Sequence, residues 1–355
     1  MKLLLVIVSL SIILTSFCAS ALAGQANVFI YHRFDEARYP STNISADVFR
    51  QQLEYLKTSG IDVVSAEEIV QALGAGEPLP ERAAAITVDD AFSSFYEVAM
   101  PILKEYGFPT TLFVNTDSVG ASGYMTWEQI RSAVDQGVAI GHHTAAHPYL
   151  VEKEGTETDS QWHQRILQDL GRAQQAFIEE LGFEPQLFAY TYGEYTPQLV
   201  DLIKEFGFSG AFAQQSGVVW EGDNRFVLPR FPMGGPFATY EGFLSKLKMK
   251  ALQVEEVSLV DPIIRQQNPP LLRLKLKSSA DAKRHFNCFA QGDNSCTVRQ
   301  IPGQEGWIEV QAEKPLTGRR NKYTLTMQPA SGGWAWYSQL WVNANSPVAG
   351  LTKND

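Results

Sequence analysis

Basic residues are scarce in this chain of 355 residues, where 29 lysines and arginines face 39 aspartates and glutamates and the formal net charge is −10. Such a balance disfavours nucleic acid or an anionic lipid surface as a partner, because both repel an acidic protein. Long hydrophobic runs are also scarce, and none after the N-terminus approaches the ~20 residues that a membrane span needs. A neutral or cationic partner and no transmembrane segment are therefore expected.

The apolar run at the N-terminus is too short to cross a bilayer. Lys2 precedes it, the run extends from Leu3 to Phe17, and small residues follow at Ala21 and Ala23. A basic start, a short apolar stretch and a small-x-small site are typical of a secretory signal. We expect residues 1–23 to be a signal peptide and the protein to be exported, to the periplasm or the exterior.

Cysteine is nearly absent, with three residues in the whole chain. Cys18 would leave with the signal peptide, which leaves Cys288 and Cys296 eight positions apart. An even pair in an exported chain favours one disulfide closing a short loop. Two free thiols are the alternative.

The order of periodic segments predicts two domains. From Val28 to about Lys250, short β-like runs alternate with helical ones, which predicts an α/β domain with a parallel sheet over residues 24–250. Ser65, Thr126 and Thr196 fit helix N-caps. From Ala251 onward, runs such as "LLRLKLK" and "WIEVQAE" alternate with period two. Residues 251–355 are therefore expected to form an antiparallel β-sandwich.

Polar side chains follow the predicted strands of the α/β domain. Carboxyl ends of parallel strands meet at one edge of a sheet, so these side chains are expected to converge there. The residues at these ends are His32, Asp89, Asp90, His142, His143, His147, Thr191, Tyr192, Gly193 and Arg230.

Three of the six histidines lie between positions 142 and 147. Two imidazoles and a carboxylate suit zinc or another divalent first-row ion such as cobalt or nickel. The i, i+4 spacing of His143 and His147 predicts that both lie on one side of a helical turn. His142 would point elsewhere, either behind the ligands or along the wall of a groove.

Three segments, "ITVDDAF", "HTAAH" and "FAYTYGEY", resemble in that order the signature motifs of the NodB-homology polysaccharide deacetylases, carbohydrate esterase family four. The resemblance covers roughly residues 27 to 245. It implies a distorted (β/α)7 barrel and a divalent metal. It also implies Asp89 as general base, Asp90, His143 and His147 as metal ligands, and the backbone N–H of Tyr192 as an oxyanion donor.

The chain departs from that family pattern in several places. Ala91 stands where the first motif usually has glycine, Thr191 stands where the third usually has proline, and the family's usual arginine and late catalytic histidine are missing. The segment "FIYHRF" is similar to circularly permuted members acting on poly-N-acetylglucosamine, which implies His32 as general acid. Arg230 is predicted to replace the missing arginine and to orient Asp89.

Aromatic residues near the motifs are candidates for sugar contacts, since pyranose faces stack on aromatic rings. Tyr190, Tyr195 and Trp127 are predicted to bind substrate, with ordinary core packing as the alternative. In the β domain, Trp334, Trp336 and Trp341 could form a sugar platform or fill the sandwich core.

Together these features predict a monomeric, exported, metal-dependent enzyme that removes acetyl groups from an N-acetylglucosamine polysaccharide and releases acetate. Two alternatives remain open at this point. One is an esterase acting on O-acetylated polysaccharides such as xylan, because the same residues can cleave esters. The other is a carbohydrate-binding protein that kept the metal site and lost turnover.

Overall fold

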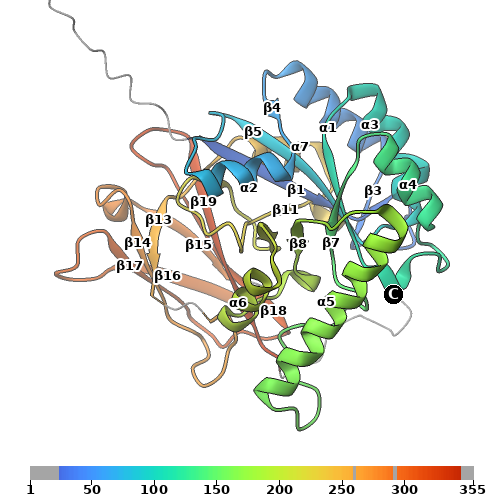
Figure 1. The fold of residues 1–355 in the computed structure, drawn as a ribbon. Coiled ribbons are helices and arrows are strands. Elements are labelled where there is room, and N and C mark those ends of the chain that lie inside the picture. The colour runs from blue at the N-terminus through green and yellow to red at the C-terminus, as the bar shows by residue number, and fades with distance from the viewer. Residues whose placement is uncertain (1–23, 259–260, 291–293, 345–355) are drawn as a thin grey trace, which may run out of the picture.

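The computed structural model describes residues 24–258, 261–290 and 294–344, and Figure 1 shows an α/β part followed by a β part. The predicted signal peptide lies outside the described residues. Within them, no helix combines the length and the apolar character that crossing a membrane requires.

A curled, mostly parallel sheet forms the centre of the α/β part. Its strands, in spatial order, are β10 (Val219–Trp220), β1 (Gln25–Tyr31), β5 (Ala83–Asp89), β6 (Thr110–Val114), β7 (Ala139–His142), β8 (Leu187–Ala189) and β9 (Gly210–Phe212), while β4 (Asp62–Val63) pairs with β5 and β11 (Phe231–Pro232) with β1. Only β10 runs antiparallel to its neighbour. Leu228 bridges Phe212 of β9, and Phe231 pairs with Phe29 of β1. Residues 228–232 therefore link the two sides of the curled sheet.

Helices cover the outside of this sheet (Figure 1). They are α1 (Ala46–Thr58), α2 (Ala66–Ala75), α3 (Met100–Tyr106), α4 (Trp127–Asp135), α5 (Asp159–Leu181), α6 (Pro197–Phe206) and α7 (Tyr240–Leu247). The predicted N-caps are confirmed, because the side chains of Ser65, Thr126 and Thr196 each accept a hydrogen bond from the backbone N–H at position N3 of their helix. A π-helical segment, Phe95–Ala99, leads into α3 and was not predicted.

Among its described residues, the C-terminal part is built from strands apart from one short 3₁₀ turn. These are β12 (Met249–Ala251), β13 (Val254–Val257), β14 (Leu272–Leu276), β15 (Phe286–Ala290), β16 (Asn294–Gln300), β17 (Trp307–Ala312), β18 (Arg320–Met327) and β19 (Trp334–Val342), paired in the order β12-β19-β18-β15-β16-β17-β14-β13. Side chains from both halves of this sheet share one core that contains Leu274, Ile308, Leu325 and Trp341. Strand β12 spans the predicted boundary at residues 250 and 251 and pairs with β19.

Cys288 of β15 and Cys296 of β16 form the predicted disulfide, with their Cα atoms 5.5 Å apart. The bridge joins two adjacent antiparallel strands across a separation of eight residues. Chain-entropy arguments give such a loop about 2.5 kcal/mol of stabilisation. A Cys288→Ser, Cys296→Ser double variant is expected to lose about that much unfolding free energy in urea titration. An unchanged midpoint would show that strand pairing alone holds this hairpin.

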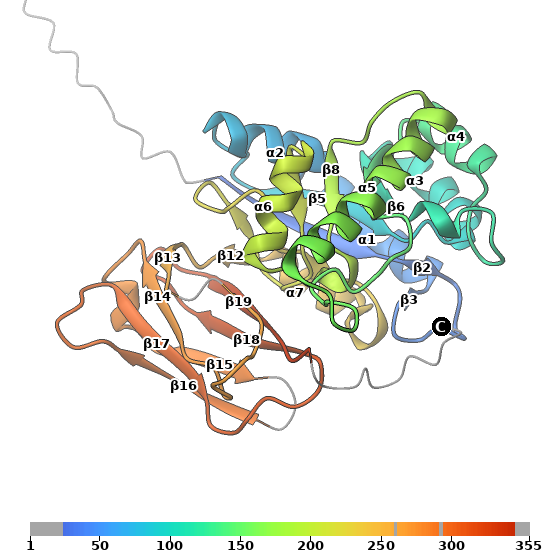
Figure 2. The same cartoon turned by 60° about the horizontal axis from the view of Figure 1, so that its bottom comes forward.

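The two parts share an extensive interface. Leu340 and Val342 of β19 pack into the same cluster as Leu199 and Ile203 of α6. Figure 2 shows α6 on the side of the α/β part that faces the strands. The three tryptophans of the β domain have different surroundings. Trp341 is buried in the β core, whereas Trp334 is 41% exposed. Trp336 reaches the α/β part, where its Nε1 donates to Ser216 O over 3.0 Å and its ring packs edge-on against Phe231.

Candidate metal centre and catalytic residues

The two aspartates lie where β5 ends and the chain turns sharply. Asp89 is the last residue of β5. Asp90 and Ala91 follow with φ of 76° and 54°, in the left-handed region that favours glycine. This conformation explains why glycine would suit position 91. It also directs the two carboxylates differently, so that Asp89 is fully buried while 16% of the Asp90 side chain is exposed.

The histidine loop follows β7 without forming a helix, so the predicted helical turn is wrong. Thr144 and His147 have φ of 69° and 54°, and His147 N donates to Thr144 Oγ1 over 3.0 Å. Asp169 of α5 accepts from the backbone N–H groups of Ala145 and Ala146 at 3.0 and 3.2 Å. The Asp169 carboxylate of helix α5 therefore stabilises the conformation of the loop that carries His143 and His147.

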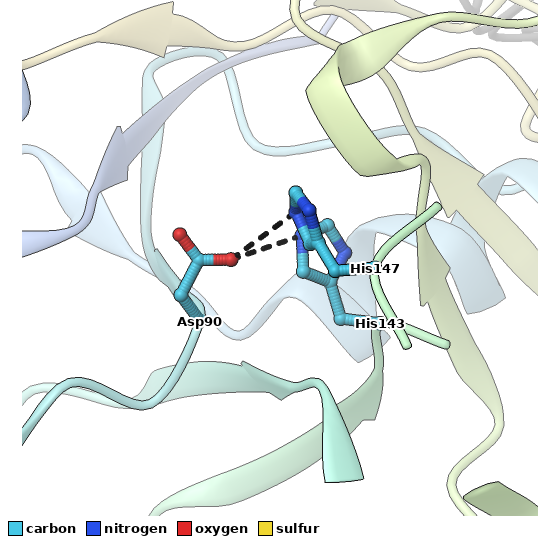
Figure 3. A group of neighbouring side chains, drawn as sticks. All are labelled: Asp90, His143 and His147. Carbon is cyan, nitrogen blue, oxygen red and sulfur yellow. Dashed lines mark ion pairs between the residues drawn. The ribbon is translucent and has the colours of Figure 1, made fainter. Parts of the chain in front are cut away.

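Asp90, His143 and His147 converge on one point (Figure 3). The Oδ1 atom of Asp90 lies 3.4 Å from Nε2 of His143 and 3.4 Å from Nε2 of His147. One ligand atom from each of the three residues lies within 4.8 Å of the others. Two imidazole nitrogens and one carboxylate oxygen at this spacing can hold a single first-row divalent ion with further positions open.

The surroundings of these three residues fit a bound cation. Nδ1 of His143 lies 2.7 Å from Ala189 O, which places the proton on Nδ1 and aims the Nε2 lone pair at Asp90. Asp90 Oδ1 is buried and has no hydrogen-bond partner among the described residues. Burial alone would raise the pKa of Asp90, but the nearby His143 and His147 hold it well below its usual range. A buried, ionised oxygen without a donor is what a metal ligand requires.

Arg230 holds Asp89 through a bidentate ion pair. Its Nη1 and Nη2 donate to the two carboxylate oxygens at 2.7 and 2.8 Å, and both side chains are fully buried. Nε of Arg230 donates to Ala213 O, and Nη1 also reaches Thr87 Oγ1. Burial would raise the pKa of Asp89, but Arg230 and His143 outweigh it and keep the pKa below its usual range. The predicted contact between Arg230 and Asp89 is confirmed.

His32 lies between β1 and β2 (Arg33–Phe34), at the same end of the sheet. Burial lowers the pKa of His32, whereas Asp90 and Asp89 act to raise it. The charges of both aspartates and of Arg230 all reach this imidazole, so His32 belongs to the same electrostatic cluster. Its assignment as general acid stays a prediction.

Tyr192 occupies a turn that touches the histidine loop. It has φ of 58°, its ring stacks on Tyr149 with centroids 4.0 Å apart, and it meets His147 edge-on at 4.5 Å. Arg320 from β18 donates to Tyr192 O over 3.3 Å. The β domain therefore contacts the turn that carries the predicted oxyanion donor.

His142 does not line a groove, so that part of the prediction is wrong. Its side chain is fully buried among phenylalanines, Nδ1 accepts from Thr144 N at 3.0 Å, and Nε2 lies 3.2 Å from Leu170 O. These contacts make it a neutral structural residue that supports the histidine loop from behind. Burial lowers its pKa to about 3.

The buried state of His142 predicts that the protein loses stability in mild acid. The unfolded imidazole takes up a proton below pH 6.5 whereas the folded one does not, so folding weakens by about 2 kcal/mol between pH 7 and pH 5. Asn at this position can still accept from Thr144 N and does not titrate. Urea unfolding of the wild type and of His142→Asn at both pH values should show a smaller acid loss in the variant. Equal losses would exclude His142 as the source.

The prediction that Tyr190 contacts a sugar is wrong. Tyr190 is fully buried, and its hydroxyl donates to Phe226 O within the core. Tyr195 is 9% exposed and lines a separate cavity between the two domains. Trp127 begins α4 and packs edge-on against Phe177, and its contact with substrate stays a prediction.

Several residues at the site were not found from the sequence. Tyr149 lies only two positions after His147 and could have been suspected as an aromatic neighbour. Arg319 and Arg320 come from a β domain more than a hundred residues later, and no local pattern marks them. Only the tertiary arrangement shows that they reach Glu194 and Tyr192.

Comparisons with known proteins agree with this site. A family model described as polysaccharide deacetylase matches residues 76–211. The poly-β-1,6-N-acetyl-D-glucosamine N-deacetylase of Escherichia coli (strain K12) is 27% identical over 222 residues, covering 52% of this chain and 33% of that protein. A protein of the same name from Staphylococcus aureus (strain MRSA252) is 23% identical over 214 residues, covering 59% of this chain and 73% of that protein.

The fold comparison agrees with the sequence comparison. IcaB from Ammonifex degensii matches with a TM-score of 0.54 and 29% identity, covering 62% of this chain and 96% of that one. The residues that match the family model, 76–211, lie in the α/β part, and the chain spans only 33% of the length of the Escherichia coli relative. The resemblance carried by the three motifs is confirmed, because residues 76–211 match the polysaccharide deacetylase family model and the Escherichia coli and Staphylococcus aureus relatives are named as N-deacetylases.

Proposed function

We propose that this protein is an exported, metal-dependent deacetylase that removes N-acetyl groups from a β-linked N-acetylglucosamine polysaccharide and releases acetate. The observation that carries the proposal is the position of Asp89, buried and ionised, beside the cluster of Asp90, His143 and His147. The names of the Escherichia coli and Staphylococcus aureus relatives support the choice of an N-acetylglucosamine polymer as substrate. The disulfide fits an oxidising compartment.

The metal would be held by Asp90, His143 and His147, and zinc suits their donor set best. When bound, such an ion supplies Lewis acidity that polarises the acetyl carbonyl and favours ionisation of water. Asp89 then takes the proton of the attacking water, since Arg230 keeps its carboxylate ionised and fixed in orientation. The backbone N–H of Tyr192 is assigned to the oxygen that becomes negative in the transition state.

His32 is assigned to donate a proton to the departing amine nitrogen. Burial lowers the pKa of His32, which favours the neutral imidazole in the free protein. The assignment therefore depends on a proton that reaches His32 during the reaction, and we assign Asp89, which takes a proton from the attacking water, as its source. Loss of acetate release in His32→Ala, with metal binding retained, would support this role.

The proposal is tested by acetate release from N-acetylglucosamine oligomers, with and without added zinc, cobalt or nickel. Asp89→Asn is expected to lower the rate roughly 100-fold or more, because it removes the proton acceptor. Asp135→Asn, which removes an exposed carboxylate at the end of α4, is the matched control and should leave the rate unchanged.

The same assay separates the alternatives. Release from acetylated xylan but from no N-acetyl oligomer would replace the proposal with the esterase. Binding of oligomers without any release would indicate a protein that kept the site and lost turnover. Asp90→Asn should in either case weaken zinc binding in a direct metal titration, because it removes one of the three ligands.

A further inference from the structure

A second cavity lies between the α/β part and the β domain. It has a volume of about 340 Å³, which falls within the range of small-molecule sites. Its walls come from Tyr195 and α6, from residues 215–229, from Leu252 and β13, and from β19. None of Asp89, Asp90, His143 and His147 lines it, so this cavity is separate from the candidate metal centre.

Aromatic side chains form much of its wall. Tyr195 and Trp220 come from the α/β part, and Trp336 and Tyr337 come from β19. Their positions are held by specific contacts, since Trp336 Nε1 donates to Ser216 O and Tyr337 Oη donates to Gln339 Oε1 over 3.1 Å. Rings fixed from both domains offer flat faces to a sugar ring and π-faces to a cation.

One buried polar group in this cavity lacks a partner. Gln215 is 6% exposed, and its Nε2 donates to Val227 O over 2.7 Å. Its Oε1 is buried and accepts no hydrogen bond from any described residue. A buried acceptor left unsatisfied is unfavourable, and a ligand hydroxyl or amine would satisfy it.

The charge of the lining is negative. Its carboxylates come from Asp201, Asp223 and Glu255, and the only cation among its described residues is Lys204. Lys204 donates to Asp201 over 3.1 Å, and Glu255 lies 3.7 Å from Nζ of Lys275 outside the lining. Asp223 accepts from Trp220 N at 3.0 Å and has no ion pair with any described lysine or arginine. Burial raises the pKa of Asp223 to about 7, as expected of a carboxyl without a nearby cation. The cavity thus presents an unpaired carboxylate and an unpaired amide oxygen between aromatic walls.

We infer that this cavity binds a hexosamine unit that carries a free amine, with Asp223 and Gln215 receiving its polar groups and the aromatic walls holding its ring. The identity of the ligand rests on the proposed function, because that reaction leaves a free amine on each processed unit. The second site would then retain the deacetylated polymer while the metal centre works on another unit.

The test is the binding of a β-linked glucosamine dimer to the full protein by isothermal titration calorimetry, with the neutral N-acetylated dimer as comparison. Asp223→Asn keeps an oxygen acceptor for Trp220 N and removes the charge, so it should weaken binding of the glucosamine dimer about tenfold. Asp90→Asn, at the metal centre, and the exposed Asp135→Asn should leave this binding unchanged. Glu255→Gln, at an exposed position of the rim, should weaken it by a smaller factor.

Several results would overturn the inference. Equal affinity for the two dimers would exclude recognition of the amine. Affinity that falls in Asp90→Asn and not in Asp223→Asn would place the ligand at the metal centre instead. If Asp223→Asn fails to fold, the Glu255→Gln variant decides the test. An unchanged affinity of that variant for the glucosamine dimer would overturn the inference by itself. Binding that depends on Asp223, in a protein that releases no acetate, would leave this inference standing and refute the proposed function.

Discussion

Replacing Arg230 with methionine is expected to lower the free energy of unfolding by about 3–5 kcal/mol, because it leaves the fully buried Asp89 carboxylate without its partner. The same change removes what keeps the Asp89 pKa low. Without Arg230 the pKa rises, a larger fraction of Asp89 is protonated at neutral pH, and the rate of acetate release should fall with it. Urea unfolding and the acetate assay measure the two effects separately.

A double variant distinguishes the ion pair from simple loss of packing. Arg230→Met combined with Asp89→Asn removes both charges. The double variant should therefore regain part of the unfolding free energy that Arg230→Met loses, but it should not regain activity. Arg131→Met is the matched control, since Arg131 pairs with Glu180 at the surface and such pairs contribute about 0–1 kcal/mol. A stability loss under 1 kcal/mol in Arg230→Met would contradict a buried, charged Asp89.

Local features of the fold could be predicted because they depend on nearby residues. The helix starts at Ser65, Thr126 and Thr196 each follow from side chains within a few positions. The link made by residues 228–232 could not be predicted in the same way. It consists of one isolated bridge and one two-residue strand, which is too little chain for a periodic pattern.

At the site, too, some features could be predicted from the sequence and others could not. Asp89, Asp90, His143 and His147 could be identified because each lies at or just after the carboxyl end of a strand in a parallel sheet, and such ends converge. The helical turn was wrongly predicted because spacing alone does not reveal positive φ at Thr144 and His147, which Asp169 and Thr144 Oγ1 stabilise. Tyr190 was misassigned because an aromatic residue beside a motif looks the same in sequence whether it faces substrate or the core.

Replacing Arg319 is expected to have a second large effect on stability and activity, because Arg319 connects the β domain to the turn that carries Tyr192. Its Nε and Nη2 donate to the two oxygens of Glu194 at 2.8 and 2.7 Å, and its Nη1 donates to Glu152. The side chains of Arg319 and Glu194 are 5% and 1% exposed. The guanidinium also lies over the ring of Tyr149, 3.9 Å from its centroid, and Tyr149 stacks on Tyr192.

Arg319→Met is therefore expected to lower the free energy of unfolding by about 3–5 kcal/mol, since the buried Glu194 is left unpaired. Burial already raises the pKa of Glu194 against the opposing effect of Arg319, so its carboxyl should become protonated in the variant. Glu194 directly follows the turn Thr191–Gly193, and small displacements of a positioned donor can lower rates up to about 100-fold. A clear loss of acetate release is expected even at temperatures where the variant is folded.

Two comparisons decide whether this effect comes from the buried pair. Arg273→Met removes the same side chain from an exposed pair with Glu309 in the same domain, and it should lose no more than about 1 kcal/mol. Adding Glu194→Gln to Arg319→Met should restore part of the stability, because no buried charge remains. If activity survives in a folded Arg319→Met protein, Arg319 does not position Tyr192, and the contact of Arg320 with Tyr192 O is the remaining link between the β domain and this turn.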